Sequence, residues 1–230
     1  AMVPGMWLNE GGQSAAGAAI AQLLRHHPAH AEARDLAREA GQSLPDWLAL
    51  QAGQSTKDMG SILACADGLI VVPEFLGNRA PFADPHTRAV IAGLGMEDNI
   101  ESLVALYIAG LCGIGYGLRQ IIDAQDARGA KITSIVISGG AGRSDLVRQI
   151  LADSTTVPVE APDTEEPVLL GAAMLGALAQ APKADAFQTM QRMSKIATRY
   201  APDTARIRDL HSRRFEQFQK LQALAREISS

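Results

Sequence analysis

Apolar residues recur at three- and four-residue intervals along much of the chain, the spacing that places them on one face of a helix. This pattern predicts helices over residues 14–25, 31–40, 45–52, 98–128, 143–153, 165–180, 184–193 and 204–229. Ser14 is the expected N-cap of the first helix, and Asp163 or Thr164 that of the helix over 165–180. The almost purely apolar run 167–179 suits a buried helix.

The helix over residues 98–128 combines a long apolar face with four glycines. Gly110, Gly113, Gly115 and Gly117 lie in its interior, where each destabilises a helix by about 1 kcal/mol relative to alanine. Such residues are useful where another element has to approach the helix closely. We therefore expect a tightly packed neighbour along this stretch, without being able to identify it from the sequence.

Short runs rich in β-branched residues separate the helices and predict strands over residues 68–75, 89–92, 131–138 and 157–160. The run 131–138 (KITSIVIS) is apolar enough for a buried strand. Strand and helix alternate from there onward, which predicts an α/β layer built around a largely parallel sheet. Because no low-complexity linker interrupts the chain, residues 1–230 are expected to form one domain.

Composition narrows the classes of function. Hydrophobic residues make up 47% of the chain and its net charge is −4, so no basic field attracts nucleic acid or an anionic membrane surface. The run 167–179 is also too short to cross a bilayer. Cys65 and Cys112 lie in apolar surroundings and are expected to be buried, reduced thiols of a cytoplasmic protein. The five histidines lack zinc-site spacing, so a metal site built from this chain alone is not expected.

The segment ISGGAGRSD (residues 137–145) is a candidate nucleotide site. A strand that ends in Gly139 and Gly140 allows a sharp turn and close approach of a ligand to the backbone. The helix that follows offers unpaired N–H groups and the positive end of its dipole, which favour phosphate. The segment is neither a Walker A loop nor a GxGxxG motif, and a tight connection without ligand explains it equally well.

Two further segments contain clusters of polar residues. In NEGGQSAAGAAI (residues 9–20), Glu10 could hold a polyol hydroxyl, although spacing alone favours a solvated loop residue. The segment EFLGNRAPFADPHTR (residues 74–88) contains charged and imidazole side chains that could suggest acid–base chemistry. A structured, turn-rich loop packing on its phenylalanines is the favoured interpretation of that segment.

These three segments, in this order, resemble the C-terminal domain of the FGGY family of carbohydrate kinases over about residues 3–200. The residues of their motifs are most similar to those of the ribulokinase, or pentulose kinase, branch. The resemblance implies an actin-like ATPase fold of two ribonuclease-H-like domains with additional helices, of which this chain is the C-terminal half. It also implies transfer of phosphate from ATP, with Mg²⁺, to a ketopentose such as ribulose. Alternatives are glycerol, xylulose or gluconate as acceptor, or a non-catalytic module that binds nucleotide or sugar.

The same resemblance assigns roles to individual positions. It places Glu10 toward the sugar, and it places on the nucleotide side Gly17, Gly139, Gly140, Ala141 and Ser144. Ser144 stands where glycerol kinases have an asparagine, and Ala21 stands where they often have a glutamine.

No catalytic residue is expected in this chain. The family's general base is an aspartate that, with a Gly-Thr phosphate loop, belongs to the N-terminal domain and should precede Ala1. The chain, which begins without an initiator methionine, is therefore expected to be inactive alone and to have that N-terminal domain as its partner. A homodimer is a further possible assembly.

Overall fold

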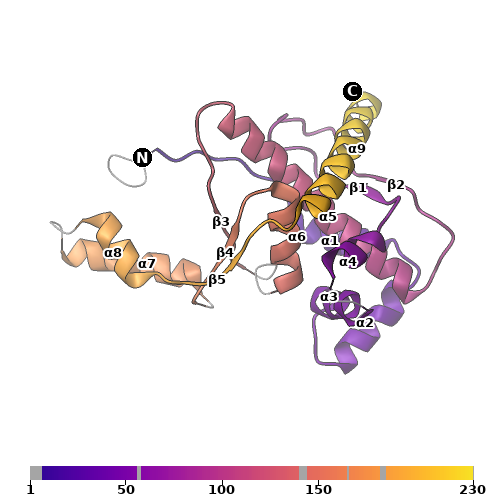
Figure 1. The fold of residues 1–230 in the computed structure, drawn as a ribbon, viewed down its shortest axis with the longest axis horizontal. Coiled ribbons are helices and arrows are strands. Elements are labelled where there is room, and N and C mark those ends of the chain that lie inside the picture. The colour runs from indigo at the N-terminus through magenta and orange to yellow at the C-terminus, as the bar shows by residue number, and fades with distance from the viewer. Residues whose placement is uncertain (1–6, 56–57, 140–143, 165, 182–184, 230) are drawn as a thin grey trace.

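The computed structural model describes residues 7–55, 58–139, 144–164, 166–181 and 185–229. Its helices are α1 (Ala16–Arg25), α2 (His30–Glu39), α3 (Leu44–Ser55), α4 (Met59–Ala64), α5 (Ile100–Asp126), α6 (Asp145–Thr155), α7 (Pro167–Gln180), α8 (Ala186–Met193) and α9 (Ala205–Ser229). Its strands are β1 (Ile70–Val72), β2 (Val90–Ala92), β3 (Ile135–Val136), β4 (Val159–Pro162) and β5 (Ile196–Tyr200). Most helices gather around α5, while α7 and α8 lie at one end of the molecule (Figure 1).

Helix α5 is the centre of the core, and α1, α3, α6 and β1 pack against it. Leu103, Ile108 and Cys112 on this helix are completely buried. By length and composition alone α5 could cross a membrane, but 72% of its most apolar window is buried inside the fold. Helix α5 is therefore the core helix of this fold.

The glycines of α5 are the points of closest packing, as the sequence predicts. A Cβ on Gly113 would collide with the backbone carbonyl of Val71 in β1. A Cβ on Gly115 would collide with α6, and one on Gly117 would lie 2.8 Å from the side-chain nitrogen of Gln13. The neighbours that the sequence could not identify are thus β1, α6 and the segment that precedes α1.

The strands form two small sheets, and the prediction of a largely parallel sheet is wrong. Strands β1 and β2 pair antiparallel. Strand β4 pairs parallel with β3 and antiparallel with β5. Strand β5 has no counterpart among the predicted elements, because its first four residues are all exposed and lack the apolar alternation of a strand. The strand predicted over 131–138 is present but is reduced to the two residues of β3, and the predicted burial is wrong, since Val136 is 58% exposed.

Several predicted helix starts need correction. The residue that precedes α1 is Ala15, in a left-handed conformation (φ 58°) with no side-chain cap, so Ser14 is not the N-cap. Glu166 precedes α7, again without a side-chain cap, so neither Asp163 nor Thr164 caps that helix. The short helix α4, which has too few residues to show a clear period, does have an N-cap, because the Asp58 carboxylate accepts a hydrogen bond from the Ser61 N–H.

Two groups predicted to be buried are exposed. Helix α7 has no buried residue, and its apolar side chains Val168, Leu169 and Leu175 are 63–78% exposed. Cys65 is exposed as well, whereas Cys112 is buried, and both thiols are free. A purely apolar helix is normally covered, so α7 presents a face that the other elements of the described chain leave open.

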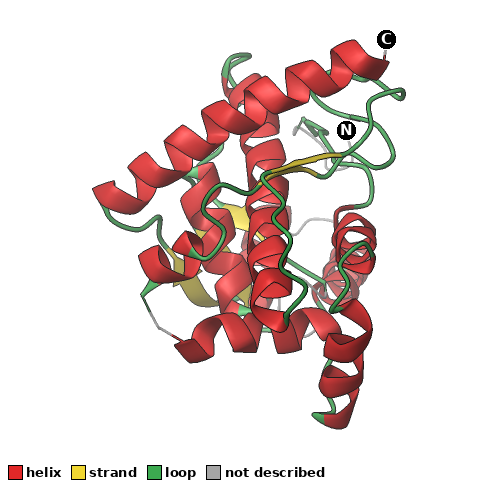
Figure 2. Cartoon of the chain, turned by 90° about the vertical axis from the view of Figure 1, so that its right-hand side faces the viewer, coloured by secondary structure: helices red, strands yellow, loops and turns green. Residues whose placement is uncertain are grey.

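Helix α9 closes the fold on the side opposite α7. It contacts α5, α6, β1 and β2 and is the long helix that ends at the C-terminus in Figure 2. The apolar residues Ile207, Phe215 and Phe218 on its inner face are buried, whereas Leu224 is 50% exposed. The same buried face also carries polar side chains, including His211 and Gln222, which the apolar pattern does not indicate.

Candidate functional site

The segment before α1 runs across α5 and presents Glu10. A Cβ on Gly11 would lie 2.5 Å from the side chain of Ile121, so glycine lets the backbone run close to the helix. The amide nitrogen of Gln13 donates a 2.7 Å hydrogen bond to the Ile114 carbonyl and fixes the segment there. Glu10 is therefore held on a firmly attached stretch of backbone.

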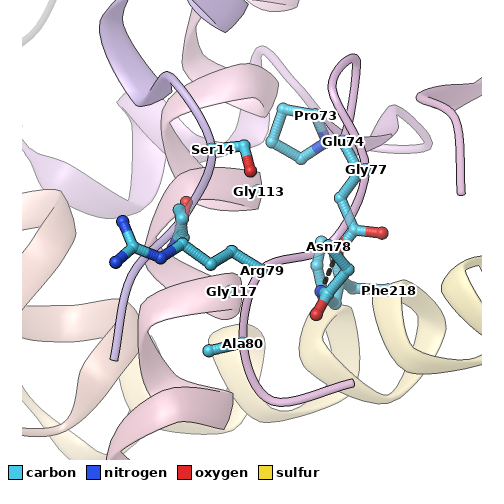
Figure 3. Close-up of a pocket in the computed structure, with 11 residues that line it drawn as sticks. Ser14, Pro73, Glu74, Gly77, Asn78, Arg79, Ala80, Gly113, Gly117 and Phe218 are labelled. Atoms are coloured by element: carbon cyan, nitrogen blue, oxygen red, sulfur yellow. Dashed lines mark hydrogen bonds between the residues drawn. The ribbon is translucent and has the colours of Figure 1, made fainter. Parts of the chain in front are cut away.

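The carboxylate of Glu10 forms an ion pair with the guanidinium of Arg79, from the loop that joins β1 to β2. In Figure 3 the Arg79 side chain extends from this loop toward the segment that precedes α1. Both side chains are well exposed, at 69% for Glu10 and 61% for Arg79. An exposed ion pair contributes at most about 1 kcal/mol to stability, so this pair adds little to the stability of the fold.

The loop over residues 73–88 is structured, as the favoured interpretation predicts. Phe75 packs against the core, but Phe82 is 40% exposed, so the predicted packing is confirmed for Phe75 only. The backbones of Asn78 and Asp84 form a bridge with N–H to oxygen distances of 2.7 and 2.8 Å. Gly77 (φ 81°) lies where a Cβ would be 2.8 Å from the Asp84 carbonyl oxygen, so only glycine suits this turn. Hydrogen bonds from Thr87 and from the His86 N–H lower the pKa of Asp84 to about 2. Asp84 is thus ionised at neutral pH, and its carboxylate stabilises the loop by accepting hydrogen bonds instead of taking part in proton transfer.

A groove of about 450 Å³ opens beside the ion pair, a volume within the usual range for small-molecule sites. Its lining residues come from the segment before α1, the β1–β2 loop and the end of α5, and they are Trp7, Asn9, Glu10, Gly11, Ala80, Pro81, Ile121, Ala124, Gln125, Arg128, Gly129 and Ala130. A smaller cavity of about 20 Å³, lined by residues that include Ser14, Glu74 and Arg79, is shown in Figure 3. It has room for about one water molecule.

The candidate nucleotide residues lie on other elements. Gly139 follows β3 in a left-handed conformation (φ 87°), the conformation expected of the predicted turn. The Ser144 hydroxyl caps α6 by accepting a 3.4 Å hydrogen bond from the Val147 N–H, so it is engaged within the helix start. Gly17 is an exposed residue in the first turn of α1, with open space around it.

Gly140 and Ala141 lie outside the described residues. Among the residues that are described, no hydrogen bond or ion pair joins Glu10 to Gly139 or Ser144.

The start of α6 contains a polar cluster that the sequence does not indicate. The Tyr200 hydroxyl donates a 2.7 Å hydrogen bond to the Asp145 carboxylate. The Arg148 guanidinium donates to both groups, at 3.0 Å to Tyr200 and 3.1 Å to Asp145. Its positive charge offsets that of Asp145, so the N-terminus of α6 does not carry an uncompensated carboxylate. Tyr200 lies 55 residues beyond Asp145, and no local pattern signals such a contact.

Metal ligands do not cluster in the ranges that the structure describes. No group of three or more His, Cys, Asp or Glu side chains there could hold an ion.

Comparisons with known proteins agree with the mixed α/β fold. The profile of the FGGY family of carbohydrate kinases, C-terminal domain, matches residues 1–180. The chain therefore belongs to the FGGY family of carbohydrate kinases.

Relatives cover most of the chain. An FGGY carbohydrate kinase domain-containing protein of Danio rerio is 33% identical over 230 residues, which are 100% of this chain and 42% of that protein. The similar human protein is 35% identical over 96% of this chain and 40% of its own length. A D-ribulokinase of Saccharomyces cerevisiae is 36% identical over 76% of this chain and 25% of its own length. The chain thus spans less than half the length of these relatives.

Solved structures show the same fold. A xylulose kinase from Rhodospirillum rubrum superposes with a TM-score of 0.68 and 24% identity, covering 92% of this chain and 38% of that one. A Plasmodium falciparum glycerol kinase with ADP gives a TM-score of 0.68 and 19% identity over the same shares. The fold of the described chain is therefore that of the corresponding part of sugar kinases.

Proposed function

We propose that this chain is the C-terminal, ligand-binding part of an ATP-dependent kinase that phosphorylates a ketopentose such as ribulose. The observation that carries the proposal is the ion pair between Arg79 and Glu10, because Glu10 lines the groove of about 450 Å³ and so does Ala80, the residue after Arg79. A carboxylate accepts hydrogen bonds from sugar hydroxyls, and a guanidinium donates them to hydroxyl or carbonyl oxygens. The similarity to a D-ribulokinase supports a pentulose as the acceptor.

ATP is the proposed phosphate donor, bound at the turn after β3 and the start of α6. The turn at Gly139 and the N-terminus of α6 provide backbone N–H groups and a positive dipole end that fit an anionic nucleotide. The similarity in fold to a glycerol kinase with ADP supports this assignment. The described residues contain no group of three or more His, Cys, Asp or Glu side chains that could hold an ion. We propose that the N-terminal domain contributes ligands to Mg²⁺. We also propose a cytoplasmic location, where ATP is available as donor.

The rest of the protein is proposed to complete the fold as well as the chemistry. We infer that the three-stranded β3–β4–β5 sheet belongs to a larger ribonuclease-H-like sheet, with strands contributed by polypeptide outside this chain. The same polypeptide would cover the exposed apolar face of α7. It would also supply the general base, since phosphoryl transfer requires donor, acceptor and carboxylate to be positioned together.

The test is ADP release from the full-length protein with ATP, Mg²⁺ and a panel of D- and L-ribulose, D- and L-xylulose, glycerol and gluconate, with the 230-residue chain assayed in parallel. Turnover of ribulose by the full-length protein and none by the chain is the expected result. Preference for xylulose would replace ribulose by another ketopentose, and preference for glycerol or gluconate would replace the proposed class of substrate. Absence of turnover on every acceptor would favour a non-catalytic binding module, and turnover by the chain alone would refute the proposed place of the base.

Glu10→Gln in the full-length protein tests the sugar side of the site. Loss of a charged hydrogen-bond acceptor should raise the KM for the sugar by about tenfold or more, while the KM for ATP stays within about twofold. Glu97→Gln, at an exposed position of the loop before α5, is the matched control and should change neither value. Equal effects on both substrates would contradict the assignment of Glu10 to the sugar.

A further inference from the structure

Helix α9 lies beyond the part of the chain that matches the family profile, yet it makes two side-chain contacts with the loop over residues 73–88. The first is made by Gln222, which is 2% exposed. Its amide nitrogen donates a 2.7 Å hydrogen bond to the Glu74 carboxylate at the start of the loop. Gln222 is itself fixed by Gln120 of α5, with the two amide groups exchanging hydrogen bonds of 2.8 and 3.1 Å. The loop is thereby tied to two core helices.

Glu74 connects Gln222 to the rest of the loop through hydrogen bonds. The carboxylate oxygen that binds Gln222 also accepts a hydrogen bond from the Asn78 side-chain amide. The Asn78 side-chain oxygen in turn accepts a 3.0 Å hydrogen bond from the Phe82 N–H, and Asn78 also pairs with Asp84 through its backbone. The conformation of the loop therefore depends on a chain of bonds that begins at α9.

The second contact is made by Arg226, one turn further along α9. Its guanidinium lies 3.4 Å from the Asp84 carboxylate and 4.1 Å from the centre of the Phe82 ring. The two contacts hold opposite ends of the loop: Glu74 lies before Arg79 and Asp84 lies after it.

We propose that Gln222 and Arg226 are positioning residues, which hold the loop so that Arg79 meets Glu10 at the sugar groove. The inference rests on the proposed function, because it assigns Arg79 to the sugar. Arg79 directly follows Asn78 in the chain, so a shift of Asn78 moves the Arg79 backbone with it. Helix α9 is a rigid base for this, because Phe218, one turn before Gln222, is completely packed in the core at 1% exposure.

Amide hydrogen exchange of the full-length protein tests the anchoring without relying on activity. Gln222→Leu keeps the side-chain volume but removes the donor to Glu74. The N–H groups of Asn78, Phe82 and Asp84 should then exchange at least about tenfold faster, because their partners lose the anchor. Amides in the middle of α5 should be unaffected, and Gln219→Leu, at an exposed position of α9, should change neither region. Unchanged loop exchange, or equal acceleration in α5, would overturn the proposal.

Kinetics of the same variants test the consequence for the substrate. Gln222→Leu and Arg226→Leu should each raise the KM for the sugar by about tenfold, the effect of losing a hydrogen bond to a charged group. The KM for ATP and kcat should stay within about twofold, whereas a purely structural defect would lower the active fraction and leave the KM for the sugar unchanged. An unchanged KM for the sugar, with the loop loosened, would overturn the positioning role.

Glu74→Gln separates positioning from catalysis. The glutamine carbonyl can replace the accepting oxygen of Glu74, so this conservative variant should retain most of the sugar affinity that Glu74→Ala loses. Loss of all turnover in Glu74→Gln would make Glu74 a catalytic group and overturn the proposal. If the wild-type protein turns over no acceptor, the proposed function fails, while the exchange measurement still decides whether α9 holds the loop.

Discussion

Asp153 on α6 is a completely buried carboxylate, and its charge makes the stability of the fold depend on pH. One of its oxygens accepts hydrogen bonds from the Asp203 N–H at 2.7 Å and from the Gln149 amide at 3.0 Å. The other oxygen is buried without a partner among the described residues. Burial raises the pKa of Asp153 from 3.8 to about 6, against the smaller effect of its hydrogen bonds. We predict that the stability of Asp153→Asn relative to the wild type is greater at neutral pH than at acid pH.

The size of the effect follows from the difference between the folded and unfolded pKa values. Because the pKa of Asp153 is higher in the folded state, its contribution to the stability of the wild type is fully present below about pH 4. This contribution is lost as the pH rises through about 6. A shift of about two pKa units corresponds to about 3 kcal/mol of folding free energy. This value is the upper bound of the stability that the wild type loses when Asp153 ionises. Asparagine keeps an oxygen for the Asp203 and Gln149 donors and carries no charge, so it escapes this loss.

Urea denaturation of both proteins between about pH 4 and pH 7 measures this effect. The free energy of unfolding of Asp153→Asn minus that of the wild type should increase by about 2–3 kcal/mol over this range. His211 has its pKa lowered to about 4 by burial, so it destabilises the fold on the acid side, but it does so equally in both proteins. A difference that stays constant with pH would refute the assignment of the charge to Asp153.

Packing and exposure give two further predictions. Gly113→Ala should destabilise the fold by about 2 kcal/mol or more in urea denaturation, because its Cβ meets the Val71 carbonyl; Gly171→Ala on α7, with open space around it, should instead stabilise by about 0.5–1 kcal/mol. Ala172→Cys on the exposed face of α7 should react with a maleimide at least about tenfold faster in the 230-residue chain than in the full-length protein, with the exposed Cys65 as internal reference. Equal rates would contradict coverage of α7 by the rest of the protein.

The candidate site could be predicted from the sequence only in pieces. Glu10 stands out because two glycines follow it, and the start of α6 stands out because Gly139 ends a run of strand-forming residues. Arg79, which stands among several other polar residues of its loop, becomes distinctive only when the fold brings it to Glu10, 69 residues earlier. The bond between Gln222 and Glu74 joins residues 148 positions apart, and neither has a local pattern that signals the contact.

The sequence by itself determined the existence of the described helices other than the short α4, the close packing of α5 and the family, because periodicity, glycine content and motif order are properties of consecutive residues. Only the tertiary structure decided which surfaces are covered. The apolar composition of α7 predicts burial, but burial requires a neighbour on every apolar side, and among the described elements α8 packs against α7 without burying any of its residues. The same holds for the sheet: β5 pairs with β4 although its first four residues are exposed, because the partner of an edge strand depends on where the fold returns the chain.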